Sequence, residues 1–294
     1  MLTALLAYLI DRIFGELPVK HPVVWMGEYI SWFESRFWRD SVTLGILLAL
    51  SLLAISTALS LLFVWGVGFL PSYAQIALTA VVASSFIASN MLHSSVKNAL
   101  EAQDKRAALS MLVSRDTVAL ETSDINKALI ETYAENLNDA VIAPLFYLCL
   151  FGLPGIVAYK AINTLDSMVG YHTARYERFG KFSARIDDIV GFIPARITAL
   201  LITAASLSFK SAKDAIRYGG GHESPNAGYP IAAIAGAVGV RLGGNTVYHG
   251  ELKSKPYFGN GEANITDAHV RMALSLQPRF DILILTILLC GAVI

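Results

Sequence analysis

Acidic and amide side chains crowd into one short patch, Glu131, Glu135, Asn136, Asn138 and Asp139, just before an uncharged stretch. Positions four apart share one face of a helix, so Glu131, Glu135 and Asp139 are expected to form one stripe of carboxylates. Like charges at this spacing destabilise a helix, and a divalent cation removes that cost. Mg²⁺ binds a few carboxylates together with substrate phosphates and waters. The patch therefore predicts a magnesium site, with a solvated acidic face as the alternative.

A second polar group follows in Asn163 and Asp166, which stand three positions apart. On a helix this spacing lets both side chains face the same way, as metal ligands or hydrogen-bond acceptors. The alternative is that one of them caps the start of a helix, because Asn and Asp are favoured there.

A third group lies where an apolar segment begins, with Arg185, Asp187 and Asp188 before it and Arg196 inside it. An ionisable residue within an apolar segment is a functional candidate, and a planar guanidinium suits phosphate or carboxylate. The alternative for Arg196 is a structural ion pair with Asp187 or Asp188.

The stretch Gly219–Gly228 contains His222, Ser224 and Asn226 among several glycines. Glycine lets backbone N–H groups approach an anion closely, so we expect either a nucleotide-binding loop or a flexible surface loop. No G-x-x-x-x-G-K-[ST] motif occurs in the sequence, so any ATP would be held without a Walker motif.

Composition places these groups in a membrane protein. Charged residues make up 16% of the chain, against roughly 25% in soluble domains, and the mean hydropathy is +0.52. No charged residue occurs between Val42 and Val96, which is more than twice the roughly 20 residues of one membrane helix. Gly and Pro at 66–72 predict a turn, hence a helical hairpin over 43–66 and 73–93. The net charge of zero gives no basic surface for nucleic acid.

The remaining segments predict an all-α, polytopic membrane protein with about 4–6 membrane helices in a single integrated domain, 1–294. Residues 28–39 suit an interfacial helix, and 97–139 suit polar extramembrane helices before the motif-bearing region 131–230. The uncharged segment 140–159 contains two glycines and two prolines. It is expected to be re-entrant, because a full crossing would export five basic residues against the positive-inside rule. Cys149 and Cys290 have no partner spacing, which argues against a disulfide or a zinc site.

Taken in order, the motifs resemble those of the CobD/CbiB family, the adenosylcobinamide-phosphate synthases of cobalamin biosynthesis. The resemblance covers nearly the whole chain and rests on six ordered motifs, each weak alone: Asp11…Gly15…Pro18…His21-Pro22…Gly27, Arg115-Asp116-Thr117, Glu135-Asn136…Asp139…Pro144, Asn163-Thr164…Asp166-Ser167, Arg185…Asp187-Asp188…Pro194-Ala195-Arg196 and Ser224-Pro225-Asn226-Ala227-Gly228.

The resemblance implies an integral protein of the bacterial inner (plasma) membrane with its active site facing the cytoplasm. The implied reaction is ATP-dependent amide formation between the free carboxylate of adenosylcobyric acid and aminopropanol, as its O-phosphate, or a related amino alcohol. It also implies Mg²⁺, contact with membrane lipid, other cobalamin-pathway enzymes as partners, and no nucleic acid.

Roles at these positions follow from chemistry. The expected metal shell is Glu135, Asp139 and Asp166, with Asp187 and Asp188 as further candidates. Arg115, Arg185 and Arg196 are expected to hold phosphate or the corrin carboxylate, with His222, Ser224 and Asn226 lining the nucleotide or amino-alcohol pocket. His21, Asn136 and Asn163 complete the predicted binding residues, and the predicted catalytic residues are Glu135, Asp139, Asp166 and Arg196.

Two other classes stay open. A magnesium-dependent membrane transferase acting on a lipid substrate would also place carboxylates at membrane-helix ends, but its usual D-x-x-x-D or D-x-x-D-G-x-x-A-R patterns do not occur here. A non-enzymatic membrane regulator related to the family would be expected to lose the acidic motifs, all of which are present.

Overall fold

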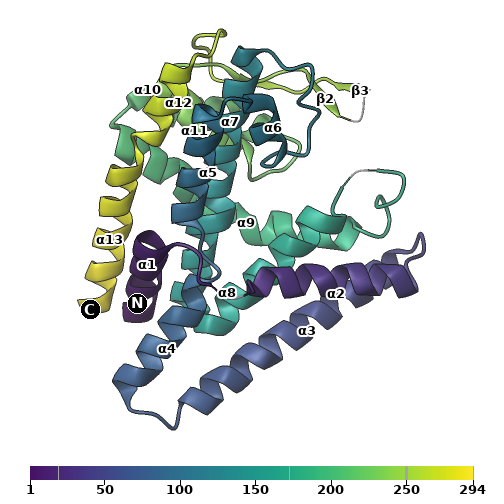
Figure 1. Cartoon of the computed structure of the whole chain (residues 1–294), viewed down its shortest axis with the longest axis vertical. Coiled ribbons are helices and arrows are strands. Elements are labelled where there is room, and N and C mark those ends of the chain that lie inside the picture. Colours follow the sequence, from purple (N-terminus) through teal and green to yellow (C-terminus); the bar gives the residue numbers. More distant parts are fainter. Residues whose placement is uncertain (19, 172, 249–250, 294) are drawn as a thin grey trace. The chain divides into compact units, whose positions relative to one another are not determined.

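The computed structural model describes residues 1–18, 20–171, 173–248 and 251–293 (Figure 1). The chain forms two compact units. The first unit contains Met1–Ala88, Asp139–Gly191 and the chain from Leu288, and the second contains Ser89–Asn138 and Phe192–Ile287. Each unit is described by itself below.

The first unit is helical. Its elements are α1 (Leu2–Phe14), α2 (Pro22–Phe37), α3 (Val42–Val67), α4 (Ser72–Ser84), a π-helical turn (Asn138–Ile142) that begins one residue outside the unit, α8 (Ala143–Val169) and the start of α9 (Lys181–Ser206). Helix α1 packs against α4, and both α2 and α3 pack against α8. Helix α8 is therefore the centre of this unit.

The second unit contains the shorter polar helices and the small strands. Its elements are α5 (Ser89–Glu101), α6 (Lys105–Ser110), α7 (Thr122–Leu137), the rest of α9, α10 (Phe209–Tyr218), a 3₁₀ turn (Gly219–Gly221), α11 (Gly228–Val238), β1 (Leu242–Gly243), β2 (Thr246–Tyr248), β3 (Glu251–Lys253), β4 (Tyr257–Phe258), α12 (Asp267–Leu274) and most of α13 (Gln277–Val293). Strand β1 pairs antiparallel with β4, and β2 with β3. Helix α11 packs against α7 and α10.

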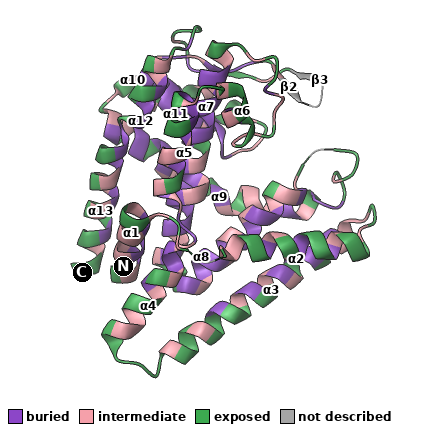
Figure 2. Ribbon diagram, viewed as in Figure 1, coloured by how far each residue is buried: buried purple, intermediate pink, exposed green. Residues whose placement is uncertain are grey.

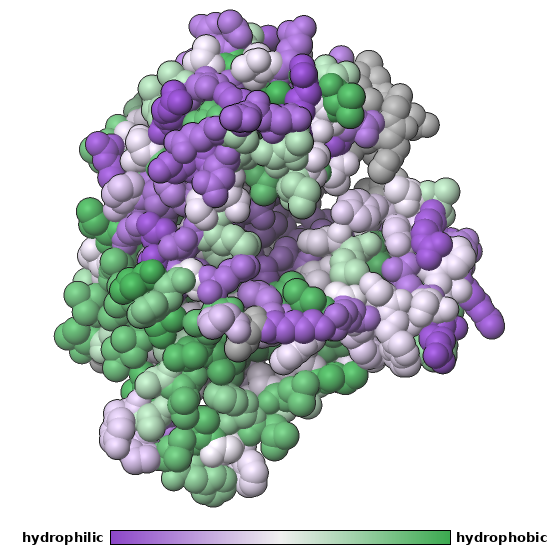
Figure 3. Space-filling model, viewed as in Figure 1, coloured by the Kyte–Doolittle hydropathy of each residue, from purple (hydrophilic) through white to green (hydrophobic). Residues whose placement is uncertain are grey.

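Long apolar helices confirm the prediction of a polytopic α-helical membrane protein. Among the described residues, five helical segments are long and apolar enough to cross a membrane: Val42–Val67, Ser72–Glu101, Thr122–Val169, Lys181–Ser206 and Asp267–Val293. Only 28% of the most apolar part of α3 is buried. Figure 2 shows the exposed residues along α3 and α13, and Figure 3 shows hydrophobic side chains gathered over α3 and α4. Such surfaces suit lipid rather than water.

The predicted hairpin is present, but its second arm is shorter than expected. Helix α3 ends at Val67 and α4 begins at Ser72, as the Gly and Pro residues between them predicted. The expectation of one helix over 73–93 is wrong, because α4 ends at Ser84 and α5 begins at Ser89.

Helix α8 reverses direction at Gly152, where φ is 65° and ψ is −155°. The rings of Tyr147 and Tyr159 consequently stack with centroids 5.2 Å apart. The ammonium of Lys160 lies 3.4 Å from the carbonyl oxygen of Asp139, 21 residues earlier. The first arm, 143–151, is about 13 Å long at 1.5 Å per residue, less than half of the roughly 30 Å hydrocarbon layer. The chain therefore turns back on itself within 140–159, and re-entry of this segment into the membrane stays a prediction.

This reversal yields a prediction for Gly152. Only glycine adopts its backbone conformation without strain, so Gly152→Ala should destabilise the protein by ~1–3 kcal/mol. Thermal unfolding in detergent would measure the loss. The matched control is Gly66→Ala, because Gly66 lies in α3 with nothing within 4 Å of an added Cβ. The control should be neutral or slightly stabilising, and equal midpoints for the two variants would contradict the account of the reversal.

Candidate active site

Three carboxylates in the first unit lie within electrostatic range of a fourth, Asp187. Asp139 lies in the π-helical turn, Asp166 in the last turn of α8, and Asp187 and Asp188 in the second turn of α9. Asp187 interacts electrostatically with the other three and with Lys160. All five side chains belong to partly buried residues. We call Asp139, Lys160, Asp166, Asp187 and Asp188 the acidic cluster.

Lys160, in the part of α8 after Gly152, contacts the π-helical turn that precedes α8. Its Nζ donates to Asn163 Oδ1 at 3.0 Å and to the carbonyl oxygen of Asp139 at 3.4 Å. A cation among four carboxylates offsets part of their mutual repulsion. The sequence analysis did not assign Lys160 a role, although a lone lysine within an apolar segment is a recognisable signal.

The end of α8 fixes Asp166. The N–H of Gly170 donates to the carbonyl oxygen of Asp166 at 2.8 Å, and a Cβ at position 170 would overlap the Asp166 carboxylate. Asn163 and Asp166 lie in the last two turns of a helix. The alternative that they cap the start of a helix is therefore wrong.

His21 caps the start of α2. Its Nδ1 accepts from the N–H of Val23 at 3.3 Å, with Pro22 at the first helical position. Burial lowers the pKa of His21; the charge of Glu16 opposes this and that of Lys160 adds to it. A neutral ring suits the capping role, and the electrostatic interaction with Lys160 relates His21 to the acidic cluster.

Glu131 does not belong to a stripe of metal ligands, so that part of the sequence interpretation is wrong. Its side chain is buried in the second unit, where Oε2 lies 2.8 Å from Arg115 Nη2 and Oε1 accepts from the N–H of Gly243 at 2.7 Å. The regular spacing behind the expected stripe also ends at Asn138, where the π-helical turn begins. Glu135, by contrast, is exposed on α7.

Arg196 lies between two aromatic rings in the second unit. Its guanidinium carbon is 3.5 Å from the ring centroid of Phe192 and 4.0 Å from that of Tyr229. Its Nη1 donates to the carbonyl oxygen of Phe192 at 2.8 Å and contacts Asn226 Oδ1 at 3.4 Å. Stacking holds the planar guanidinium in one orientation.

The predicted binding residues of the glycine-rich stretch form one hydrogen-bonded turn. The N–H of Ser224 donates to His222 Nδ1 at 3.0 Å, and the N–H of Asn226 donates to Ser224 Oγ at 3.2 Å. Burial lowers the pKa of His222, and nearby Lys255 lowers it further. A neutral His222 keeps Nδ1 as an acceptor. Since Asn226 is buried and contacts Arg196, the turn is an ordered structure rather than a flexible loop.

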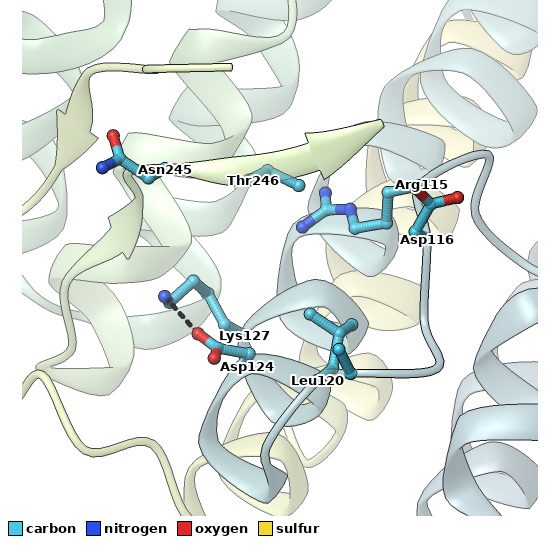
Figure 4. Close-up of a pocket in the computed structure, with 8 residues that line it drawn as sticks. Arg115, Asp116, Leu120, Asp124, Lys127, Asn245 and Thr246 are labelled. Carbon is cyan, nitrogen blue, oxygen red and sulfur yellow. Dashed lines mark hydrogen bonds and ion pairs between the residues drawn. The ribbon is translucent and has the colours of Figure 1, made fainter. Parts of the chain in front are cut away.

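The remaining predicted binding residues are Asn136, Arg185 and Arg115. Asn136 donates from Nδ2 to the carbonyl oxygen of Thr132 at 3.0 Å, along its own helix. Arg185 is exposed on α9, and Arg115 lines a pocket in the second unit (Figure 4). Within the described part of the chain, no three His, Cys, Asp or Glu side chains converge closely enough to hold a metal ion. Both cysteines are free, with Cys149 partly buried and Cys290 exposed.

Fold and site together define a polytopic α-helical membrane protein with a polar, acidic cluster beside a helix that is broken at Gly152. The family model described as CobD/Cbib protein matches residues 4–277, and the chain belongs to this family. It is 42% identical to the probable cobalamin biosynthesis protein CobD of Pyrococcus furiosus, over 82% of this chain and 84% of that protein. It is 41% identical to the cobalamin biosynthesis protein CobD of Pelobacter propionicus, over 87% and 84%. No solved structure matches the chain.

The acidic cluster yields a prediction for Lys160. Lys160→Met should lower the free energy of unfolding by ~1–3 kcal/mol, because the carboxylates lose their cation. This loss lies between those expected for breaking an exposed ion pair and a buried one. Millimolar Mg²⁺ should restore part of the loss. Thermal unfolding in detergent, with and without Mg²⁺, measures both effects. Lys181→Met, at an exposed position at the start of α9, is the control, with an expected change within about 0.5 kcal/mol. A Lys160→Met variant as stable as this control would contradict the proposed charge balance.

Proposed function

We propose that this protein acts in cobalamin biosynthesis as a synthase that forms an amide bond. Its substrates would be the free carboxylate of adenosylcobyric acid, the amine of aminopropanol phosphate or a related amino alcohol, and ATP. Family membership and the names of the relatives support the pathway. The reaction itself is proposed from the chemistry of the site.

The observation that carries the proposal is the return of Lys160 and Asp166 to Asp139 through the reversal of α8. Carboxylates and a lysine gathered beside apolar helices are costly to maintain. Amide formation from a carboxylate would use such a group. The reaction needs cations to neutralise phosphate charge and a base to accept a proton from the amine.

The proposed reaction has two steps, activation of the carboxylate and transfer of the acyl group to the amine. An oxygen of the corrin carboxylate attacks the γ-phosphorus of ATP, and ADP leaves with the electrons of the broken P–O bond. The amine then attacks the acyl carbon, phosphate leaves, and the amine gives up a proton. In our proposal a carboxylate of the acidic cluster accepts this proton, while Lys160 offsets developing negative charge. The stacked guanidinium of Arg196 is suited to orienting a phosphate or carboxylate.

The donor set fits Mg²⁺, a cation that prefers oxygen ligands. Mg²⁺ keeps several waters and takes one or two protein carboxylates together with substrate phosphates, so it does not require three protein ligands at one point. In our proposal Asp139 and Asp166 would hold it, with Asp187 and Asp188 as further candidates in the same unit. When bound, the ion would neutralise phosphate charge during transfer.

We also propose that the protein lies in the bacterial inner membrane with the acidic cluster facing the cytoplasm. Because α8 reverses at Gly152, the basic residues that follow it return to the side from which the chain entered. That orientation keeps Lys160, Arg175, Arg178, Lys181 and Arg185 on the side favoured by the positive-inside rule.

The activity test uses the full chain purified in detergent with adenosylcobyric acid, aminopropanol phosphate and Mg-ATP. Corrin amide and ADP should form in equal amounts. Asp139→Asn should lower the rate at least ~100-fold, because it removes a charge beside the transferred phosphate. The matched control is Asp40→Asn, an acid that is 54% exposed and pairs with Arg178 at 3.5 Å; its rate should stay within about twofold of the wild type.

Three results would contradict the proposal. Wild-type protein that forms no amide with any amino alcohol would exclude the synthase. Amide formation without ADP release would exclude ATP as the activating substrate. Equal rates for Asp139→Asn and Asp40→Asn would exclude Asp139 from the reaction.

A further inference from the structure

Three exposed apolar side chains follow the end of α9 in the second unit. Leu207 is 84% exposed, Phe209 87% and Ile216 84%, so each side chain has little contact with the protein. Leu207 has a φ of 51°, and among the residues that the structure describes it is the only one besides glycines with a positive φ. This conformation is strained for a bulky residue. Strain and exposure together indicate that something outside the chain covers this segment.

Helix α10 is held against α11 by one of its faces. Ser211 Oγ donates to the carbonyl oxygen of Ala233 at 2.8 Å. A Cβ at Gly236 would lie 2.7 Å from the carbonyl oxygen of Lys210, so the backbones of the two helices are in close contact. Asp214, three residues after Ser211 and on the same face, is buried as well. This packing fixes which face of α10 points away from the protein.

The outward face of α10 has an apolar part and a cationic part. Phe209 and Ile216 are seven residues apart, which is nearly two turns, so they form one stripe. Lys213 and Arg217 are exposed next to this stripe. In the described part of the chain neither forms an ion pair, and Asp214, on which both act electrostatically, lies on the buried face. An apolar stripe flanked by cations is typical of a helix that lies in a membrane interface.

The end of α9 marks a change from apolar to polar sequence. No charged residue occurs from Ile197 to Phe209, and α9 is long and apolar enough to cross a membrane. Arg279, at the start of α13, donates from Nη1 to the carbonyl oxygen of Ala205 at 3.1 Å. Helix α13 has no charged residue after Asp281. The change between polar and apolar sequence therefore occurs at one contact in both helices, and a membrane boundary there would place α10 on the membrane surface.

The exposed apolar surface also continues along α9. Ile193 and Leu200 are exposed on this helix, and their spacing of seven residues puts them on one stripe. Leu207 follows seven residues later. Because α9 is a candidate membrane helix, the exposed side chains of α10 extend a surface that is suited to lipid.

We propose that α10 lies on an anionic phospholipid leaflet, with Leu207, Phe209 and Ile216 among the acyl chains and Lys213 and Arg217 on the headgroup phosphates. A leaflet offers an apolar layer beside a layer of negative charge, and the outward face of α10 is complementary to both. The inference does not depend on the proposed reaction. It makes α10 the element that attaches the second unit to the membrane surface.

The position of α10 can be tested on the full chain in lipid nanodiscs made of phosphatidylcholine and phosphatidylglycerol in equal parts. Cys149→Ala and Cys290→Ala remove the native thiols, and a bimane fluorophore is attached at Phe209→Cys or Ile216→Cys. Doxyl groups on the acyl chains should quench both probes strongly, and acrylamide in the water should quench them little. The control is Val118→Cys, because Val118 is as exposed as Phe209 but lies in the loop between α6 and α7. Acrylamide should be the stronger quencher there.

The role of the cations can be tested by local lipid selectivity. The doxyl group is placed either on phosphatidylglycerol or on phosphatidylcholine, and quenching of the probe at Phe209→Cys is compared. One cation near an anionic surface gives about a fivefold preference, so phosphatidylglycerol should be the better quencher by about fivefold or more. Lys213→Gln should lower this preference about fivefold. The matched control is Lys97→Gln, at an exposed position on α5, which should leave the preference unchanged.

Three results would overturn the inference. Acrylamide quenching at Phe209 and Ile216 as strong as at Val118 would show that the segment lies in water. Protection from both quenchers would assign the face to a second copy of the chain or to another protein. Equal quenching by the two lipids would exclude recognition of anionic headgroups. None of these measurements requires amide formation, so failure of the proposed function and failure of this inference are distinguishable.

Discussion

The structure depends on one constraint, that backbone polar groups in apolar surroundings must bond within the protein. In the first unit the breaks in the helices therefore satisfy one another. The N–H of Ala88, in the gap after α4, donates to the carbonyl oxygen of Ala140 in the π-helical turn at 2.9 Å. Polar side chains can be accommodated where a helix is broken in this way. Asp139, a member of the acidic cluster, lies in the π-helical turn.

The two units also differ in the charged side chains that they contain. Four partly buried carboxylates and one lysine give the acidic cluster a net negative balance, which favours cations and proton transfer. The second unit presents a different arrangement, with Arg196 stacked between two rings and Arg115 paired with Glu131. Each unit thus holds its own set of charged side chains. The orientation of each group is set by packing before any ligand binds.

Much of the fold followed from sequence patterns that act locally. The uncharged run, the Gly and Pro residues at 66–72 and the break within 140–159 each predicted an element that the structure contains. The end of α4 at Ser84 was not predictable from hydropathy, because the uncharged run continues past it to Val96. The acidic motifs were identifiable by residue type, but their partners depend on tertiary contacts. Spacing four apart suggested a common stripe for Glu131, whereas Arg115 and Gly243, distant in sequence, determine where its carboxylate lies.

The way the two units divide the chain has a consequence for biosynthesis. The first unit draws on three stretches of the sequence, the last beginning at Leu288, and the second on two that end at Ile287. On a ribosome the N-terminal helices emerge well before the residues from Leu288 onward that belong to the same unit. Each unit lacks some of its residues until α13 has been translated. The early apolar helices are therefore expected to enter the bilayer before either unit is fully assembled. Truncation within α13 would therefore disturb both units.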